Sequence, residues 1–334
     1  MEAYDILREM ERHKQAVVLA TVIHVEGHAY RKQGAMMLLM TDGSMLGSIS
    51  PGCLEADLSG YAPLVWESRK PQMVEYDMRP ADDFGWGETI GCGGLIRILL
   101  EPVTGELLVQ LLAIRAGLER GEAVRLKRVF RKGYSDIVYK LSGAYEAAEE
   151  ESGRKMPIPA YSHLFLPKPR LIIFGANPDA VPLAELAAGS GFRVVVTDWR
   201  DAYCTPERFP GAETIAAFPQ ALVQQLALRP DDYVVVMSHQ FDKDADFVRG
   251  VLNGQLQYLG IMGSRVRTEK LLDGAERPPW LHYPVGLNIG SEGPEENAVS
   301  IVAELIRTKR GIRTDGAWNS PVDPMRDGPS CRPW

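Results

Sequence analysis

The strongest constraint on the fold is a regular alternation of strand-like and helix-like segments between residues 170 and 311. Residues 171–174 form a short apolar run that predicts a buried strand, and residues 180–190 have helical spacing. Further strands are expected at 192–197, 233–237 and 258–262. Short apolar strands that alternate with helices are typical of a parallel, doubly wound sheet. We therefore expect an α/β chain whose C-terminal domain, residues 170–311, is Rossmann-like.

The first 145 residues have a different pattern, which predicts an α+β domain. Strand-like segments are followed by helical spacing at 55–66 and 107–118. Residues 146–169 are charged and then proline-rich, so we expect a linker there. Residues 312–334 show little periodicity and no core pattern, so we expect a tail without a fold of its own.

Composition argues against a nucleic-acid-binding, a membrane-spanning and a disulfide-rich secreted protein. The 334-residue chain has 37 Lys and Arg against 44 Asp and Glu, a net charge of −7, which argues against nucleic acid as a partner. No apolar run approaches the roughly 20 residues needed to span a bilayer, and the N-terminus lacks the apolar core of a signal peptide. The four cysteines show no disulfide-framework spacing. These features predict a cytoplasmic protein with reduced thiols.

Two cysteines in the N-terminal half lie next to glycine. Cys53 follows Gly52, and Cys92 precedes Gly93. Glycine allows a sharp backbone turn and the close approach of a bulky ligand to the sulfur. We predict that both thiols are partly exposed and approach one pocket, where they meet a cofactor, a metal or each other.

A zinc site is an alternative use of the same cysteines. His24 and His28 could join Cys53 and Cys92 as ligands. The four residues come from separate loops, without the closely spaced pairs that structural zinc sites favour. In that case the domain would be a zinc-supported interaction module.

The turn after the first C-terminal strand occupies the position of the Rossmann fingerprint. Gly175 opens it, Asn177 stands where the second glycine is usual, and Ala180 begins the helix. Asp198 ends the next strand, where an acid would bind a ribose hydroxyl. A dinucleotide site and a purely structural strand–helix turn are both compatible with this pattern.

Two later turns carry further candidate ligand-binding residues. His239 follows the strand at 233–237, at the edge where α/β folds place ligands, and either contacts a substrate or only satisfies backbone groups. Ser264 and Arg265 follow the strand at 258–262 and begin a helix. They either bind phosphate, or Ser264 is an ordinary N-cap.

Taken together, these motifs resemble the XdhC/CoxI family, the accessory factors of xanthine dehydrogenase and related molybdenum hydroxylases. The resemblance covers nearly the whole chain up to about Gly311. It rests on short pieces that recur in order: 20–22 with Gly27, Arg31 and Gly34; 52–55; 92–94; 238–239; 260–265; 286–290; and 294–296. Pro51, His28, Tyr30 and Asn177 depart from the family pattern.

The resemblance implies a chaperone of purine catabolism that binds the molybdenum cofactor. Such a protein supports sulfuration of the cofactor by a cysteine desulfurase and inserts it into an apo xanthine dehydrogenase-type hydroxylase. The thiols would serve as soft ligands or sulfur carriers, and Arg31, Lys32 and Arg265 would meet the pterin phosphate. The chain itself is too short, and has too few cysteines, to be a complete xanthine dehydrogenase.

The competing function is an NAD(P)-dependent oxidoreductase that uses the Rossmann half, with His239 as acid or base. No catalytic residue and no resident metal are assigned for the chaperone. We also expect at least a homodimer, because interfaces can shelter a large cofactor during its transfer.

Overall fold

The computed structural model describes residues 3–12, 16–78, 94–131, 134–143 and 160–311. The chain divides into two compact units, Met1–Lys168 and Pro169–Trp334. Among the described residues, no helix is both long enough and apolar enough to cross a bilayer.

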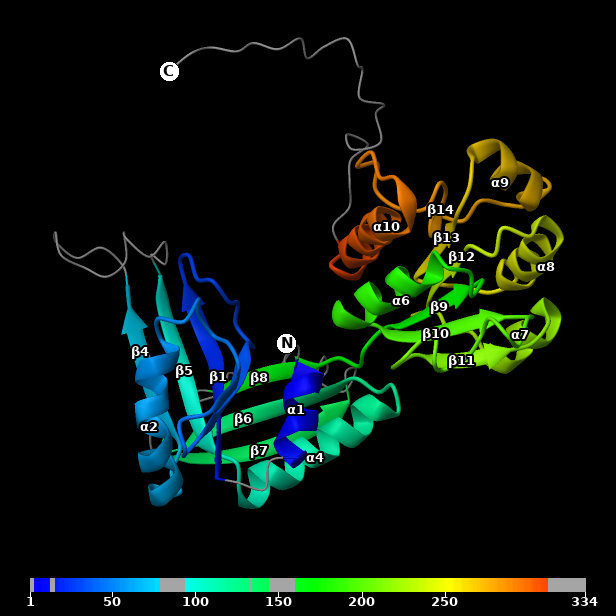
Figure 1. The fold of residues 1–334 in the computed structure, drawn as a ribbon. Helices are drawn as coiled ribbons and strands as arrows, with labels where there is room; N and C mark the ends of the chain where they lie inside the picture. The colour runs from blue at the N-terminus through cyan, green and yellow to red at the C-terminus, as the bar shows by residue number, and fades with distance from the viewer. Residues whose placement is uncertain (1–2, 13–15, 79–93, 132–133, 144–159, 312–334) are drawn as a thin grey trace, which may run out of the picture. The chain divides into compact units, whose positions relative to one another are not determined.

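Unit 1 is built on a five-stranded antiparallel sheet with the order β3-β2-β1-β5-β4. Its strands are β1 (Val17–Glu26), β2 (Met36–Met40), β3 (Met45–Gly47), β4 (Gln72–Asp77) and β5 (Leu95–Pro102). Its helices are α1 (Ala3–Arg12), α2 (Glu55–Ser68) and α4 (Gly105–Glu119). Figure 1 shows α2 lying along this sheet.

Alternation along β1 divides unit 1 into two core layers. Val18, Ala20 and Val22 pack with the buried face of α2. Val17 and Leu19 point the other way and pack with α1 and α4. This two-residue period is what a strand buried on both faces requires.

A three-stranded antiparallel sheet, β7-β6-β8, completes unit 1. It consists of β6 (Val124–Arg131), β7 (Asp136–Gly143) and β8 (Ala160–Phe165). The strand β8 corrects part of the linker expected over 146–169. Phe165 is buried in the core with α4, and this apolar contact outweighs the proline-rich composition of the flanking sequence.

Unit 2 is a six-stranded, all-parallel sheet with the order β11-β10-β9-β12-β13-β14. Its strands are β9 (Arg170–Phe174), β10 (Arg193–Asp198), β11 (Glu213–Ala216), β12 (Tyr233–Val236), β13 (Tyr258–Ile261) and β14 (Leu281–His282). Its helices are α6 (Ala180–Gly189), α7 (Pro219–Leu226), α8 (Phe241–Val251), α9 (Arg265–Leu272) and α10 (Gly293–Lys309). The predicted Rossmann-like sheet is confirmed.

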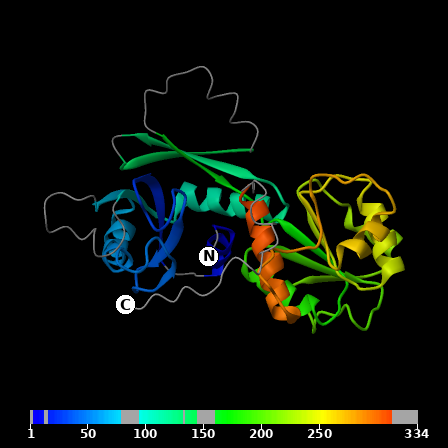
Figure 2. The same ribbon diagram turned by 90° about the horizontal axis from the view of Figure 1, so that it is seen from above.

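Helices cover both faces of this sheet. One core layer contains residues of α6 and α10, and the other contains residues of α7, α8 and α9. Figure 2 shows α10 on one side of the strands and the pair α8 and α9 on the other. Because all strands run in the same direction, the loops after them meet at one edge, where such folds bind ligands.

Candidate functional site

The Cys53 turn, residues 50–55, connects β3 to α2 and is held by its own side chains. The buried Glu55 carboxylate accepts hydrogen bonds from the backbone N–H groups of Ile49 at 2.9 Å and Ser50 at 2.6 Å, and from the Ser50 hydroxyl. The Ser50 oxygen in turn accepts the N–H groups of Gly52 and Leu54, each at 3.1 Å. Hydrogen bonds therefore fix the backbone on both sides of Cys53, at residues 49, 50 and 52 before it and at residue 54 after it.

The charge of Glu55 is stabilised by this arrangement. Burial alone would raise the pKa of the carboxyl, but the hydrogen bonds from Ser50 and Ile49 outweigh it and lower the pKa below its ordinary value. Glu55 is therefore an ionised, buried anchor of the turn at neutral pH.

The Cys53 thiol is unpaired and half-buried, and its sulfur lies 3.6 Å from the Ser50 oxygen. Gly52 has a φ of 126°, and no atom lies within 4 Å of where a Cβ would stand, so the turn opens toward space there. Cys204 contrasts with it. That thiol is 7% exposed, hydrogen-bonds to the carbonyls of Val196 and Ile215, and has a pKa raised by burial. Of these two thiols, Cys53 is the accessible one.

Several segments converge at the end of the sheet that carries Cys53. β1 and β4 end there, β2 and β5 begin there, and the loop with Arg31 joins β1 to β2. Gly94 lies so close to this loop that a Cβ would stand 2.5 Å from the carbonyl oxygens of Glu26 and His28. Arg31 and the Cys53 turn thus share one end of the sheet.

The second predicted thiol cannot be placed in this group. Cys92 and Gly93 lie outside the described residues, so the shared pocket with Cys53 stays a prediction. Among the residues that are described, no three His, Cys, Asp or Glu side chains could together hold a metal ion.

In unit 2, the fingerprint turn is filled by its own chain. Gly175 has a φ of 115°, and a Cβ there would stand 2.5 Å from the backbone of Ser238, so this glycine is needed for strand packing. The buried Asn177 side chain donates to the carbonyl of Met237 at 2.5 Å and accepts the N–H of Ala180 at 3.1 Å. Asn177 therefore joins β12 to the start of α6.

Asp198 is likewise engaged. Its fully buried carboxylate accepts the N–H of Ala176 at 2.8 Å and is paired with the Arg200 guanidinium through two contacts of 2.9 Å. Burial alone would raise the pKa, but these hydrogen bonds lower it. The oxygens that a ribose would use already have partners, which argues against classical dinucleotide binding at this turn.

His239 lies at the same edge, after β12. Its side chain is 52% exposed, and Nε2 lies 3.6 Å from an oxygen of Asp179. The neighbouring Ser238 is buried and donates to Asp244, which also pairs with Arg267 at 2.5 Å. Burial raises the pKa of Asp244. Ser238 is thus part of the framework, whereas His239 remains available to a ligand.

The predicted residues Ser264 and Arg265 lie one strand further along. Ser264 caps α9, because its hydroxyl accepts the N–H of Arg267 at 3.2 Å. Arg265 lines a cavity of about 640 Å³ at the carboxyl ends of β13 and β14. Arg265 therefore lines this cavity, whose lining includes no residue of the fingerprint turn.

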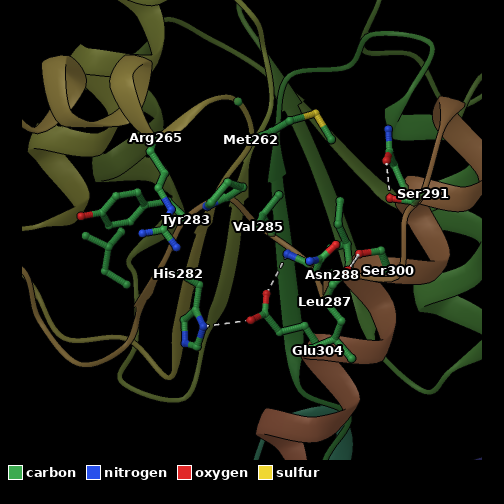
Figure 3. Close-up of a pocket in the computed structure, with 16 residues that line it drawn as sticks. Met262, Arg265, His282, Tyr283, Val285, Leu287, Asn288, Ser291, Ser300 and Glu304 are labelled. Carbon is green, nitrogen blue, oxygen red and sulfur yellow. Dashed lines mark hydrogen bonds and ion pairs between the residues drawn. The ribbon is translucent and has the colours of Figure 1, made fainter. Parts of the chain in front are cut away.

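This open cavity is lined by the connection from β13 to α9, by residues 281–288 and by α10 (Figure 3). Its floor holds Glu304, whose carboxylate accepts from the Tyr258 hydroxyl at 2.6 Å and the N–H of Gly286 at 2.8 Å. His282 Nδ1 lies 3.1 Å from the same carboxylate. Burial would raise the pKa of Glu304, but the hydrogen bonds from His282 and Tyr258 outweigh it and lower the pKa.

The floor of this cavity was not predicted from the sequence. His282 and Glu304 come from a two-residue strand and from the middle of a helix, and neither position stands out by its spacing. The glycine-rich stretch 286–290 was the available signal. Gly286 packs directly on α10, where a Cβ would stand 2.4 Å from the Ser300 oxygen.

Similarity to known proteins extends over both units. Residues 171–305 match the XdhC Rossmann domain, and residues 10–77 match the XdhC and CoxI family. The chain is 38% identical over 325 residues to a Bacillus subtilis protein named as a probable subunit of xanthine dehydrogenase, covering 92% of this chain and 98% of that protein. The chain belongs to the XdhC and CoxI family.

Two further proteins are similar to this XdhC/CoxI chain over most of its length. It is 23% identical to PaoD of Escherichia coli, a molybdenum cofactor insertion chaperone, over 87% of this chain and 83% of that one. A crystal structure described as a xanthine dehydrogenase from Bacillus halodurans is 39% identical, with a TM-score of 0.85 over 95% of this chain and 98% of the other. The Cys53 turn, the fingerprint turn and the cavity all lie within matched segments of the XdhC/CoxI chain.

Proposed function

We propose that this chain is an accessory protein that binds the molybdenum cofactor as cargo and inserts it into an apo xanthine dehydrogenase-type hydroxylase. The family relationship supports this, because PaoD is a molybdenum cofactor insertion chaperone. The name of the Bacillus subtilis relative supports a partner of the xanthine dehydrogenase class.

The observation that carries the proposal is the Cys53 turn. A chaperone has to hold a metal-centred cofactor without trapping it, so few protein ligands on a fixed backbone are suitable. Cys53 offers one soft sulfur ligand on a backbone held by Ser50 and Glu55. A thiol in such a position could also support sulfuration of the cofactor by a cysteine desulfurase.

Nothing at the fingerprint turn favours the NAD(P)-dependent oxidoreductase. Asn177 and Asp198 are both engaged by the chain itself, at the positions where pyrophosphate and ribose would bind. The geometry therefore supports the cofactor chaperone better than the dehydrogenase.

The experiment replaces Cys53 and Cys92 together by alanine, with Cys204→Ala as the control that removes a thiol elsewhere. We expect cofactor content of the purified protein to fall about tenfold or more in the double variant. The hydroxylase isolated from the same cells should carry less active cofactor. Cys204→Ala should retain cofactor binding.

Stability distinguishes loss of a ligand from loss of the fold. Cys53 lies in an open turn, so we expect the melting temperature of the double variant to stay within about 4 °C of the wild type. Equal cofactor content and a fully active hydroxylase would contradict the proposal. A large drop in melting temperature, reproduced in the wild type by a chelator, would instead support the zinc module.

We further propose that the chain assembles into at least a homodimer, which would shelter the cargo during transfer. Light scattering at working concentration tests this part separately. A mass that corresponds only to the monomer would exclude it and leave cofactor binding unaffected.

A further inference from the structure

The cavity between β13, β14 and α10 carries an uncompensated positive charge. Within the part of the chain that the structure describes, the one carboxylate that lines it is Glu304, which contacts Tyr258, His282, Gly286 and, at 3.2 Å, the Arg307 guanidinium. Arg265 is an exposed residue that lines the cavity, and it makes no hydrogen bond or ion pair with any other residue that the structure describes. A guanidinium that lines a cavity without a carboxylate partner favours an anionic ligand, and phosphate is the group it binds best.

The rest of the cavity suits a flat, partly apolar group. The His282 ring stacks on Tyr258 with a centroid separation of 4.5 Å, so one ring face is backed by another aromatic ring. Met262, Val285 and Ile301 supply apolar lining. A stacked aromatic ring beside apolar side chains is a suitable surface for a heterocycle.

Asn288 adds a polar group that can recognise the edge of such a ring. Its amide is exposed, lines the cavity and has no hydrogen-bond partner among the described residues. A side-chain amide presents a donor and an acceptor together, which matches the amide-type edges of nucleobases and pterins. Figure 3 shows Asn288 among the residues that surround the hollow.

We propose that this cavity binds a phosphorylated planar heterocycle, with its phosphate at Arg265 and its ring near His282 and Asn288. The volume of about 640 Å³ lies within the usual range of small-molecule sites, roughly 300–1,000 Å³. The ligand is either a nucleoside monophosphate or a pterin phosphate, which share this chemistry. The lining residues that the structure describes all belong to unit 2, so the inference does not depend on the Cys53 turn. A nucleotide ligand would go beyond the proposed function, whereas a pterin phosphate would deepen it, and that arm rests on the proposed function.

The fold explains why the proposed phosphate site lies at β13 and β14 and not at the turn after β9. In a Rossmann-like sheet the first choice for a phosphate is the turn after β9. Here that turn is closed by the contact of Gly175 with Ser238 and by the Asn177 side chain. The cavity at β13 and β14 remains at the same carboxyl edge, where parallel sheets place their ligands.

The test is isothermal titration of the full chain with the four common ribonucleoside monophosphates and with 6-hydroxymethylpterin monophosphate. The unphosphorylated parents, inorganic phosphate and NAD⁺ are the comparison compounds. We expect at least one phosphorylated heterocycle to bind about tenfold or more tightly than its parent and than phosphate alone. Binding confined to the pterin or to one nucleotide identifies the source.

Variants then locate the site. Arg265→Ala should weaken binding about tenfold or more, whereas Lys270→Ala, which removes an exposed positive charge from the same helix outside the cavity, should change it less than about twofold. Asn288→Asp gives a second variant at an exposed position and should also weaken binding, because a carboxylate only accepts hydrogen bonds and loses the donor that the amide offers to the ring edge. Circular dichroism checks that each variant is folded.

Three outcomes would overturn the inference: no phosphorylated heterocycle binds, binding is unaffected by both Arg265→Ala and Asn288→Asp, or NAD⁺ binds more tightly than every monophosphate. The nucleotide arms contain no molybdenum and the variants leave Cys53 intact. Failure here is therefore distinguishable from failure of the cofactor chaperone, which depends on the cysteine variants.

Discussion

At the scale of single residues, the N-terminal site depends on one buried carboxylate. Glu55 binds two backbone N–H groups and the Ser50 hydroxyl, and Ser50 binds two further N–H groups. Ser50 and Glu55 thus fix the backbone around Cys53, and neither of them is proposed as a ligand of the cofactor. Glu55 is a positioning residue, and its loss should affect the turn before it affects the rest of unit 1.

We predict that Glu55→Gln destabilises unit 1 by about 2 kcal/mol, because a neutral amide oxygen is a weaker acceptor for the same N–H groups. Urea unfolding measures this difference. The matched control is Glu67→Gln, at an exposed position near the end of the same helix, which should change stability by less than about 0.5 kcal/mol. An equal effect of both variants would mean that Glu55 does not anchor the turn.

The same substitution should also have a characteristic pH dependence. The folded pKa of Glu55 is below its ordinary value, so its stabilising contribution is present above the unfolded pKa of about 4.3 and is lost as the pH falls through the folded pKa. The wild type and Glu55→Gln should therefore converge in stability on acidification below about pH 4.3. A constant difference over that range would contradict an ionised Glu55.

At the scale of elements, unit 2 is organised by the close approach of the turn after β9 to the end of β12. Gly175 has both a positive φ and no room for a Cβ, since Ser238 backbone atoms would stand 2.5 Å away. The parallel pairing of β9 with β12 brings these two turns together. A glycine at this position therefore serves the sheet itself, independently of any ligand.

We predict that Gly175→Ala lowers the free energy of unfolding of unit 2 by about 3 kcal/mol or more, from the combined cost of strain and overpacking. Gly189→Ala is the control, because that residue lies in α6, has an ordinary φ and has open space around its Cβ position. Its effect should be neutral or slightly stabilising. Thermal and urea unfolding of both variants test the contrast, and a harmless Gly175→Ala would show that the turn can open.

At the scale of the whole molecule, the two units have separate hydrophobic cores. The two large clusters of unit 2 contain only residues between 171 and 305, and those of unit 1 contain only residues up to 165. Each unit therefore buries its own apolar surface, which is what independent folding requires.

We predict that residues 169–311 expressed alone unfold in one cooperative transition. The cavity is lined only by residues of this unit, so the fragment should also bind the ligand found with the full chain within about threefold. Near-ultraviolet circular dichroism and calorimetry provide the measurement. A fragment with secondary structure but no fixed tertiary packing would show that unit 1 is needed for the fold.

The sequence by itself determined the parallel sheet, the family and the accessible Cys53 turn. The sheet and the turn depend on local signals: apolar runs of strand length, helical spacing after each run, and glycine next to cysteine. The family was indicated by its resemblance, through short motifs that recur in the same order along the chain. It also showed that Asn177 departs from the dinucleotide fingerprint. Such features can be inferred without knowing which distant residues lie side by side.

The tertiary structure alone decided what the polar residues do. Asn177 and Asp198 are engaged by Met237 and Arg200, and the cavity needs His282 from a two-residue strand together with Glu304 from α10. The strand β8 also became a strand only by pairing with β6. These outcomes depend on contacts between residues far apart in the chain. Such hydrogen bonds and packing contacts produce no periodic pattern in the sequence, so they could not be predicted from it.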